Sequence, residues 1–120
     1  MEEPKNVLRM HTFEDVVDSY STYISSKEGK KLISDAFEYA LKKHEGQYRK
    51  SGEPYIHHLI EVAYILTTLR GGPATIASGL LHDVVEDTDT PIDEIAKLFG
   101  EDVANIVESL TKIQRMKLSK

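Results

Sequence analysis

The sequence predicts an all-α fold, a single bundle of about five or six helices built from 120 residues. Apolar residues recur at spacings of three and four along most of the chain, which is the period of an amphipathic helix. No segment has the strict apolar–polar alternation of a half-buried strand. The length suits one compact domain, and a hydrophobic content of 40% provides enough apolar residues for a core.

The first three helices are predicted from apolar periodicity and from start and stop residues. Thr12, with Asp15 three residues later, is a candidate N-cap for a helix over about 13–24. A second helix is expected over about 28–45, where Gly46 ends it, and a third from Tyr55 or Ile56 to Leu69. Between them, residues 49–54 form a polar, turn-rich loop.

Three further helices follow in the second half. One is expected from Pro73 to about Val85, and it is apolar on most sides, so it should be central. Thr90 as cap and Pro91 as first residue predict the next helix, which ends at 99–100. A last apolar series spans 103–113, after which periodicity is lost. We therefore expect one domain over 1–120, with a flexible segment at 1–11 and a frayed tail at 114–120.

Composition restricts the function. The 15 basic and 20 acidic residues give a formal net charge of −5, which argues against a nucleic-acid coat but permits a small anionic ligand. The absence of cysteine excludes disulfides and thiolate metal sites. No apolar run approaches the roughly 20 residues of a membrane span, and the N-terminus lacks a signal-peptide pattern. A cytoplasmic protein that binds neither nucleic acid nor membranes is expected.

The strongest chemical signal is the pair His82-Asp83 near the end of an apolar helix. A long imidazole and a short carboxylate on adjacent residues can converge on one ion. Glu86 and Asp87 follow one turn later, where carboxylates repel unless a cation, a proton or solvent separates them. The alternative is a His-Asp pair that hydrogen-bonds locally, followed by solvated acids, and the pair alone does not decide between the two.

A second histidine would strengthen a metal site. His58, at the border of an apolar helix face, is the best candidate, and His57 is the rival that spacing alone does not exclude. His11 and His44 are expected to be surface or capping residues. Two imidazoles and a carboxylate suit Mn, Fe, Zn or Co, and the neighbouring acids favour manganese.

Two separated motifs carry a resemblance to a known family. Residues 46–58 (GQYRKSGEPYIHH) and 80–88 (LLHDVVEDT) strongly resemble the hydrolase domain of the RelA/SpoT homologues. Phe99-Gly100 and Leu110-Thr111-Lys112 match further family patterns in register, so the resemblance covers about residues 30–113.

The resemblance implies an HD-type helical fold with one manganese ion. The implied activity is a step of the stringent response, removal of the 3′-pyrophosphate from guanosine tetra- or pentaphosphate to give GDP or GTP and pyrophosphate. On this basis the metal ligands are His58, His82 and Asp83, the acids that orient or activate water are Glu86 and Asp87, and the nucleotide-binding residues are Arg49, Lys50 and Ser51. From the residues alone, a solvated basic loop is favoured.

The sequence departs from the family pattern in two places. Leu59 stands where a proline usually follows the first metal-binding histidine. The family's fourth ligand, an Asp in a later Leu-Ala-Asp-Arg-Leu-like motif, has no counterpart in the 120 residues. We therefore expect an N-terminal piece of a longer, bifunctional synthetase/hydrolase. For the piece alone we expect weak metal binding, poor turnover and a homodimer through an exposed apolar face.

Three alternatives remain open from the sequence. The domain could be a degenerate regulatory module of an alarmone synthetase, an HD phosphohydrolase of another nucleotide, or a helical interaction module. The acidic cluster at 82–87 speaks against degeneration, because an inactive site has no need for it. A nucleotide panel tested on the complete protein separates an alarmone hydrolase from a phosphohydrolase of another nucleotide, and light scattering tests the interaction module.

Overall fold

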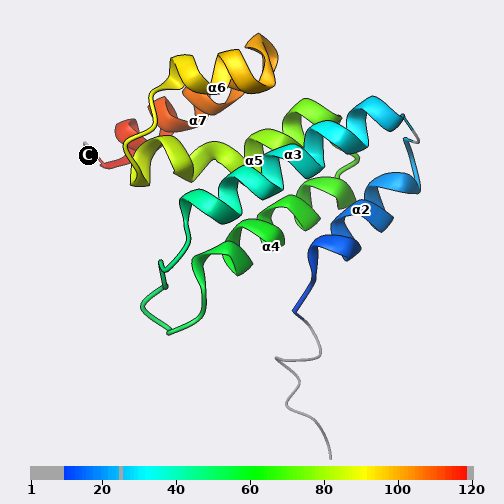
Figure 1. The fold of residues 1–120 in the computed structure, drawn as a ribbon, viewed down its shortest axis with the longest axis horizontal. Helices are drawn as coiled ribbons and strands as arrows, with labels where there is room; N and C mark the ends of the chain where they lie inside the picture. The colour runs from blue at the N-terminus through cyan, green and yellow to red at the C-terminus, as the bar shows by residue number, and fades with distance from the viewer. Residues whose placement is uncertain (1–9, 25, 119–120) are drawn as a thin grey trace, which may run out of the picture.

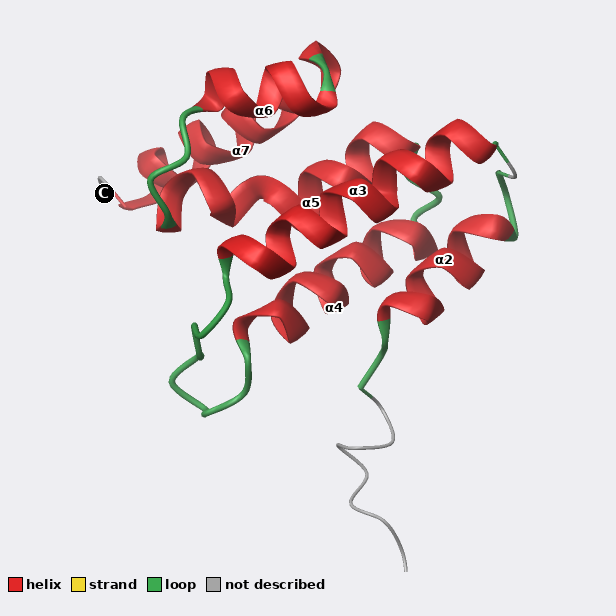
Figure 2. Ribbon diagram, in the orientation of Figure 1, coloured by secondary structure: helices red, strands yellow, loops and turns green. Residues whose placement is uncertain are grey.

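The computed structural model describes residues 10–24 and 26–118. Figure 1 shows a bundle of helices in which α3 and α5 pack against each other and the α6–α7 pair lies at one end. The six helices in this part of the chain are α2 (Phe13–Ser21), α3 (Lys27–Lys43), α4 (Tyr55–Thr68), α5 (Pro73–Asp87), α6 (Ile92–Phe99) and α7 (Glu101–Leu118). They are joined by loops (Figure 2), and the described β-structure is one isolated bridge between Tyr48 and Pro54. The all-α prediction is confirmed.

Helix boundaries follow the local signals with two informative differences. Thr12 forms the expected capping box with Asp15, and Pro73 is the first residue of α5. The prediction that Thr90 caps α6 is wrong by one residue, because Pro91 is the N-cap and the Thr90 hydroxyl instead contacts that of Thr88. Helix α5 continues two residues beyond the predicted end, to Asp87, so the last two acids of the cluster belong to its final turn.

The ends of the chain differ from expectation where the structure describes them. Helix α7 extends to Leu118, beyond the point where apolar periodicity stops. The predicted flexible segment 1–11 falls mostly on residues 1–9, which are outside the described part, but His11 is held against α4. None of the described helices is long and apolar enough to cross a membrane.

Helix α5 is the centre of the core, as its apolar sequence predicts. It packs against α3, α4 and α7. Its fully buried residues include Ile76, Leu80, Leu81 and Val84, and Asp83 is the buried carboxylate among them. Gly79 lets α4 approach closely, because a Cβ there would lie 2.6 Å from Leu66 Cδ1. The helix that carries the His-Asp pair is therefore fixed on three sides.

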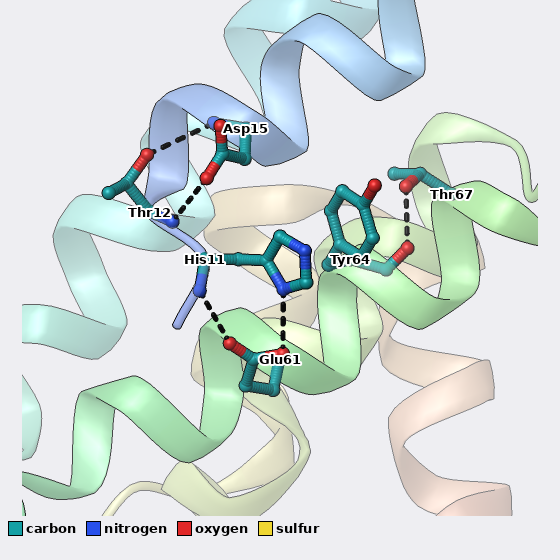
Figure 3. Close-up of polar contacts among 6 residues, drawn as sticks. All are labelled: His11, Thr12, Asp15, Glu61, Tyr64 and Thr67. Atoms are coloured by element: carbon teal, nitrogen blue, oxygen red, sulfur yellow. Dashed lines mark hydrogen bonds and ion pairs between the residues drawn. The ribbon is translucent and has the colours of Figure 1, made fainter. Parts of the chain in front are cut away.

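The segment before α2 is fastened to α4 through His11 (Figure 3). Its backbone N–H donates to Glu61 Oε2 at 2.7 Å, and its ring Nδ1 lies 2.9 Å from Glu61 Oε1. The same ring stacks on Tyr64 with centroids 3.7 Å apart. Burial by itself raises the pKa of Glu61, but the hydrogen bonds and charge of His11 more than offset this and lower it. These contacts hold α2 against the helix that carries His57 and His58.

Glu61→Gln should therefore destabilise the fold in a pH-dependent way. The pKa of Glu61 is lower in the folded protein than its ordinary value of 4.5. Ionised Glu61 therefore stabilises the fold fully at pH values above 4.5, and this stabilisation is lost as the pH falls through the lowered pKa. We expect a loss of about 1 kcal/mol at neutral pH, measured by urea unfolding, because the pair is half-exposed and screened by solvent.

Asp35→Asn is the matched control. It removes a carboxylate from the exposed pair with Lys31, whose N–O distance is 3.0 Å, and should change the unfolding free energy by less than about 0.5 kcal/mol. Equal stability of Glu61→Gln and the wild type at neutral pH, or a gap that widens on acidification, would contradict the predicted role of Glu61.

Candidate functional site

The structure brings His82 and Asp83 together on α5. His82 Nε2 lies 3.2 Å from Asp83 Oδ1, and the two side chains are 17% and 9% exposed. Two ligands of one ion, each about 2.1 Å from it, are about 3.0–3.4 Å apart when the angle between them is near 90–110°. The nitrogen and the carboxylate oxygen are therefore separated as neighbouring ligands of a single cation would be.

The contact of His82 Nδ1 decides which of the two ring nitrogens carries the hydrogen when the ring is neutral. Nδ1 lies 2.9 Å from the carbonyl oxygen of Gly79, which can only accept, so Nδ1 carries a hydrogen and donates it. In the neutral ring, Nε2 then presents a lone pair toward the Asp83 carboxylate. Two lone pairs at this distance repel unless a proton or a cation lies between them. A proton between them makes a local ion pair, and a cation makes the two atoms neighbouring ligands, so the geometry suits either one.

His58, in the first turn of α4, is the histidine whose pKa the charges of the pair affect. Burial lowers the pKa of His58 most strongly, the charges of Arg49 and His82 lower it further, and the charge of Asp83 opposes them. The charges of both members of the pair on α5 therefore change the pKa of His58 on α4. For the rival His57, the buried Nδ1 has no hydrogen-bond partner among the described residues. The electrostatic coupling favours His58.

Arg49 occupies one ring nitrogen of His58. Its Nη1 lies 3.3 Å from His58 Nδ1, and since a guanidinium only donates, Nδ1 accepts and the hydrogen of the neutral ring resides on Nε2. A cation bound to either nitrogen of a neutral ring would end this contact, because the imidazole offers one lone pair at a time. Among the described residues, no group of three or more His, Asp or Glu stands assembled around a common point. The donor types nevertheless fit a borderline divalent ion.

The other predicted residues occupy two places. Glu86 and Asp87 are exposed in the last turn of α5. The Asp87 carboxylate contributes to raising the pKa of the Tyr55 hydroxyl. Lys50 and Ser51 are exposed at the tip of a narrow loop, where Ser51 Oγ lies 3.4 Å from Glu53 Oε2. The loop is closed by the Gly52 N–H, which donates to the Arg49 carbonyl at 2.8 Å. Of the three loop residues, Arg49 is the one with a described contact to the histidine.

Tyr55 is a site residue that the sequence reasoning missed. Its hydroxyl donates to Asp83 Oδ2 at 2.6 Å, and its ring lies beside His58 and His44, with centroids 5.6 and 4.9 Å away. Burial raises the pKa of Tyr55 most, and the neighbouring Asp83 and Asp87 raise it further. A tyrosine at a helix start gives no local sign of such contacts, because its partner Asp83 is 28 residues away.

A cavity of about 830 Å³ lies between the end of α3, the loop, the start of α4 and α6. Tyr55 is part of its wall, together with Tyr39, Tyr48 and Phe99, whereas none of the predicted site residues is in its lining. His44 also lines it. This residue is the C-cap of α3, which fits one of the two roles expected for it, but the expectation of a surface position is wrong, since only 3% of it is exposed.

Comparison with known proteins identifies the family of the chain. The model of the HD domain family matches residues 36–120. The chain is 44% identical to a guanosine-3′,5′-bis(diphosphate) 3′-pyrophosphohydrolase of Spiroplasma citri over 84% of this chain and 14% of that protein. It is 52% identical to a probable enzyme of the same name from Synechocystis sp. over 73% of this chain and 12% of the relative.

A third relative has a different name. The GTP pyrophosphokinase of Myxococcus xanthus is 47% identical over 73% of this chain and 12% of the relative. The chain therefore spans a small part, 12–14%, of the length of these relatives. A family match over residues 36–120, together with this level of identity, establishes the relationship: the chain belongs to the HD-domain family and is a RelA/SpoT homologue.

Proposed function

We propose that this chain contributes the hydrolase site of a cytoplasmic, bifunctional RelA/SpoT-type enzyme. The proposed reaction removes the 3′-pyrophosphate of guanosine tetra- or pentaphosphate and yields GDP or GTP and pyrophosphate. The observation that carries the proposal is the 3.2 Å contact between His82 Nε2 and Asp83 Oδ1, with His58 coupled to both. The names of the relatives supply the substrate class.

His58, His82 and Asp83 would hold a manganese ion. Such an ion, when bound, lowers the pKa of a water ligand and withdraws charge from phosphoryl oxygens. The protein residues prepare this chemistry. The Gly79 carbonyl keeps the hydrogen of His82 on Nδ1, which leaves Nε2 available as a ligand, and burial of Asp83 keeps bulk water from its carboxylate.

Glu86 and Asp87 would orient the attacking water and accept its proton. Both are exposed in the last turn of α5, one turn beyond the proposed ligands, so their carboxylates are accessible from the solvent side of the pair. A carboxylate one turn from a metal ligand is well placed for this role because residues four apart lie on the same helix face.

Arg49, Lys50 and Ser51 would bind the nucleotide. Arg49 is adjacent to His58, and a guanidinium can fork onto phosphate or stack on a base. The exposed Lys50 and Ser51 add a charge and a hydroxyl at the loop tip. Donors on a loop whose Arg49 contacts His58 suit a ligand that carries many negative charges.

Arg49→Ala should weaken guanosine tetraphosphate binding about ten- to a hundred-fold while leaving the fold intact, because an exposed charge-assisted contact to phosphate is lost. Calorimetric titration of the 120-residue chain with the nucleotide in the presence of manganese measures this. Arg70→Ala is the control, since Arg70 follows the opposite end of α4, where its guanidinium lies over the Tyr23 ring. Equal affinity of Arg49→Ala and Arg70→Ala would remove Arg49 from the binding site.

A nucleotide panel tests the reaction itself. With manganese, the chain should release pyrophosphate from guanosine tetra- and pentaphosphate, slowly, and leave GTP and other nucleoside triphosphates unchanged. Pyrophosphate and the guanosine product are quantified by ion-exchange chromatography. Release of orthophosphate, or preferential hydrolysis of an ordinary nucleoside triphosphate, would instead indicate a phosphohydrolase with another substrate.

A further inference from the structure

Tyr55 stands where the helix that carries His58 meets the helix that carries His82 and Asp83. It is the first residue of α4, three positions before His58. Its hydroxyl donates to Asp83 Oδ2 at 2.6 Å, a length typical of strong hydrogen bonds to an ionised oxygen. This contact joins α4 to α5 at the site.

The two oxygens of Asp83 have different partners. Oδ1 is 3.2 Å from His82 Nε2, and Oδ2 accepts from the Tyr55 hydroxyl. A carboxylate held at one oxygen cannot rotate without breaking that hydrogen bond. Asp83 is only 6% exposed, so water cannot readily replace a lost partner. The orientation of Oδ1 therefore depends on the hydroxyl.

The Tyr55 ring is itself well fixed. Its centroid is 4.9 Å from that of the His44 ring and 5.6 Å from that of the His58 ring. Asp87 also interacts with its hydroxyl and raises the pKa of that group. One side chain thus contacts a proposed ligand on each of two helices. The ring forms part of the wall of the 830 Å³ cavity.

We propose that Tyr55 is a positioning residue of this site: its hydroxyl holds the Asp83 carboxylate so that Oδ1 faces His82 Nε2, and its ring sets the position of His58. The expected consequence for manganese affinity rests on the proposed function. The geometric part of the inference, the orientation of Asp83 relative to His82, holds for the chain without metal.

Tyr55→Phe tests the inference, with Tyr39→Phe as the matched control. Tyr39 lines the same cavity, and its hydroxyl also donates to a carboxylate, that of Glu94, while its ring meets Phe99 edge to face. Both variants lose one tyrosine–carboxylate hydrogen bond between helices; because burial of Asp83 makes the loss in Tyr55→Phe the costlier one, the two are compared under conditions in which urea unfolding shows both to be fully folded. Any property changed only by Tyr55→Phe is therefore not a general effect of destabilisation.

Two readouts are measured on the 120-residue chain. By calorimetry with MnCl₂, Tyr55→Phe should bind about ten- to a hundred-fold more weakly than the wild type, whereas Tyr39→Phe should stay within about two-fold of it. In side-chain ¹⁵N spectra without metal, the His82 Nε2 resonance should shift in Tyr55→Phe and stay in place in Tyr39→Phe.

The outcomes separate the inference from the proposed function. Manganese binding by the wild type and equal affinity in Tyr55→Phe would overturn the role of Tyr55 and leave the proposed function standing. No manganese binding by the wild type would refute the metal site, and the ¹⁵N spectra would then decide on Tyr55. An unchanged His82 signal in Tyr55→Phe overturns the inference in either case.

Discussion

His82→Ala should abolish specific manganese binding and with it the hydrolysis of guanosine tetraphosphate. His82 supplies Nε2, whose lone pair is available because the Gly79 carbonyl, 2.9 Å away, holds the ring hydrogen on Nδ1. Its loss leaves Asp83 buried with the Tyr55 hydroxyl as its described hydrogen-bond partner. We expect affinity to fall at least about 100-fold, more than the 10–100-fold typical when a residue that supports a ligand is lost.

His58→Ala and His57→Ala form a matched pair for the same measurement. The two histidines are adjacent, so both substitutions remove an imidazole from the first turn of α4. His58→Ala should reduce manganese affinity at least about 100-fold, and His57→Ala should leave it near the wild-type value. The reverse order would make His57 the ligand, and wild-type affinity in both variants would exclude a site shared between α4 and α5.

The second large effect concerns the contact between α2 and α3. Gly29, in the first turn of α3, faces Tyr20, whose side chain is completely buried. A Cβ at this position would lie 2.1 Å from the Tyr20 hydroxyl oxygen and 3.2 Å from Cζ. Gly29→Ala should lower the free energy of unfolding by about 2–3 kcal/mol, because the buried Tyr20 ring is rigid and cannot move away from the new methyl group. This loss exceeds the gain of roughly 1 kcal/mol from the higher helix propensity of alanine.

A double-mutant cycle with Tyr20→Phe makes this prediction specific. The Tyr20 hydroxyl is buried and has no hydrogen-bond partner among the described residues, so its removal should raise stability by about 1 kcal/mol. In the Tyr20→Phe background the most severe clash is gone, and Gly29→Ala should cost less than about 1 kcal/mol. Urea unfolding of the four proteins should give a coupling of about 2 kcal/mol, and strictly additive effects would contradict the contact.

Local signals in the sequence were sufficient to predict the helices. Side-chain capping by Thr12, proline at position 73 and three-to-four apolar spacing act within one or two turns, so they can be read without the fold. The error at Thr90 has a local cause as well. Its hydroxyl found a partner in Thr88, two residues away, and Pro91 took the cap position.

Contacts between helices could not be predicted in the same way. The residue type of Tyr55 suits a core, and only the packing of α4 on α5 brings its hydroxyl to Asp83. The expectation that His44 is a surface or capping residue holds for the cap alone, since the fold buries its ring beside that of Tyr55. The proposed ligands were found because two motifs resemble a family, and the structure adds how the hydrogen of His82 and the carboxylate of Asp83 are oriented.

The position of a bound ion tests the central claim most directly. Crystals of the chain grown with manganese, measured at an energy where manganese scatters anomalously, locate the ion independently of any assumption about ligands. The account predicts one strong anomalous peak within about 2.0–2.3 Å of His82 Nε2, an Asp83 oxygen and a His58 ring nitrogen. A peak elsewhere in the molecule, or one that contacts the α5 pair while His58 remains bound to Arg49, would contradict it.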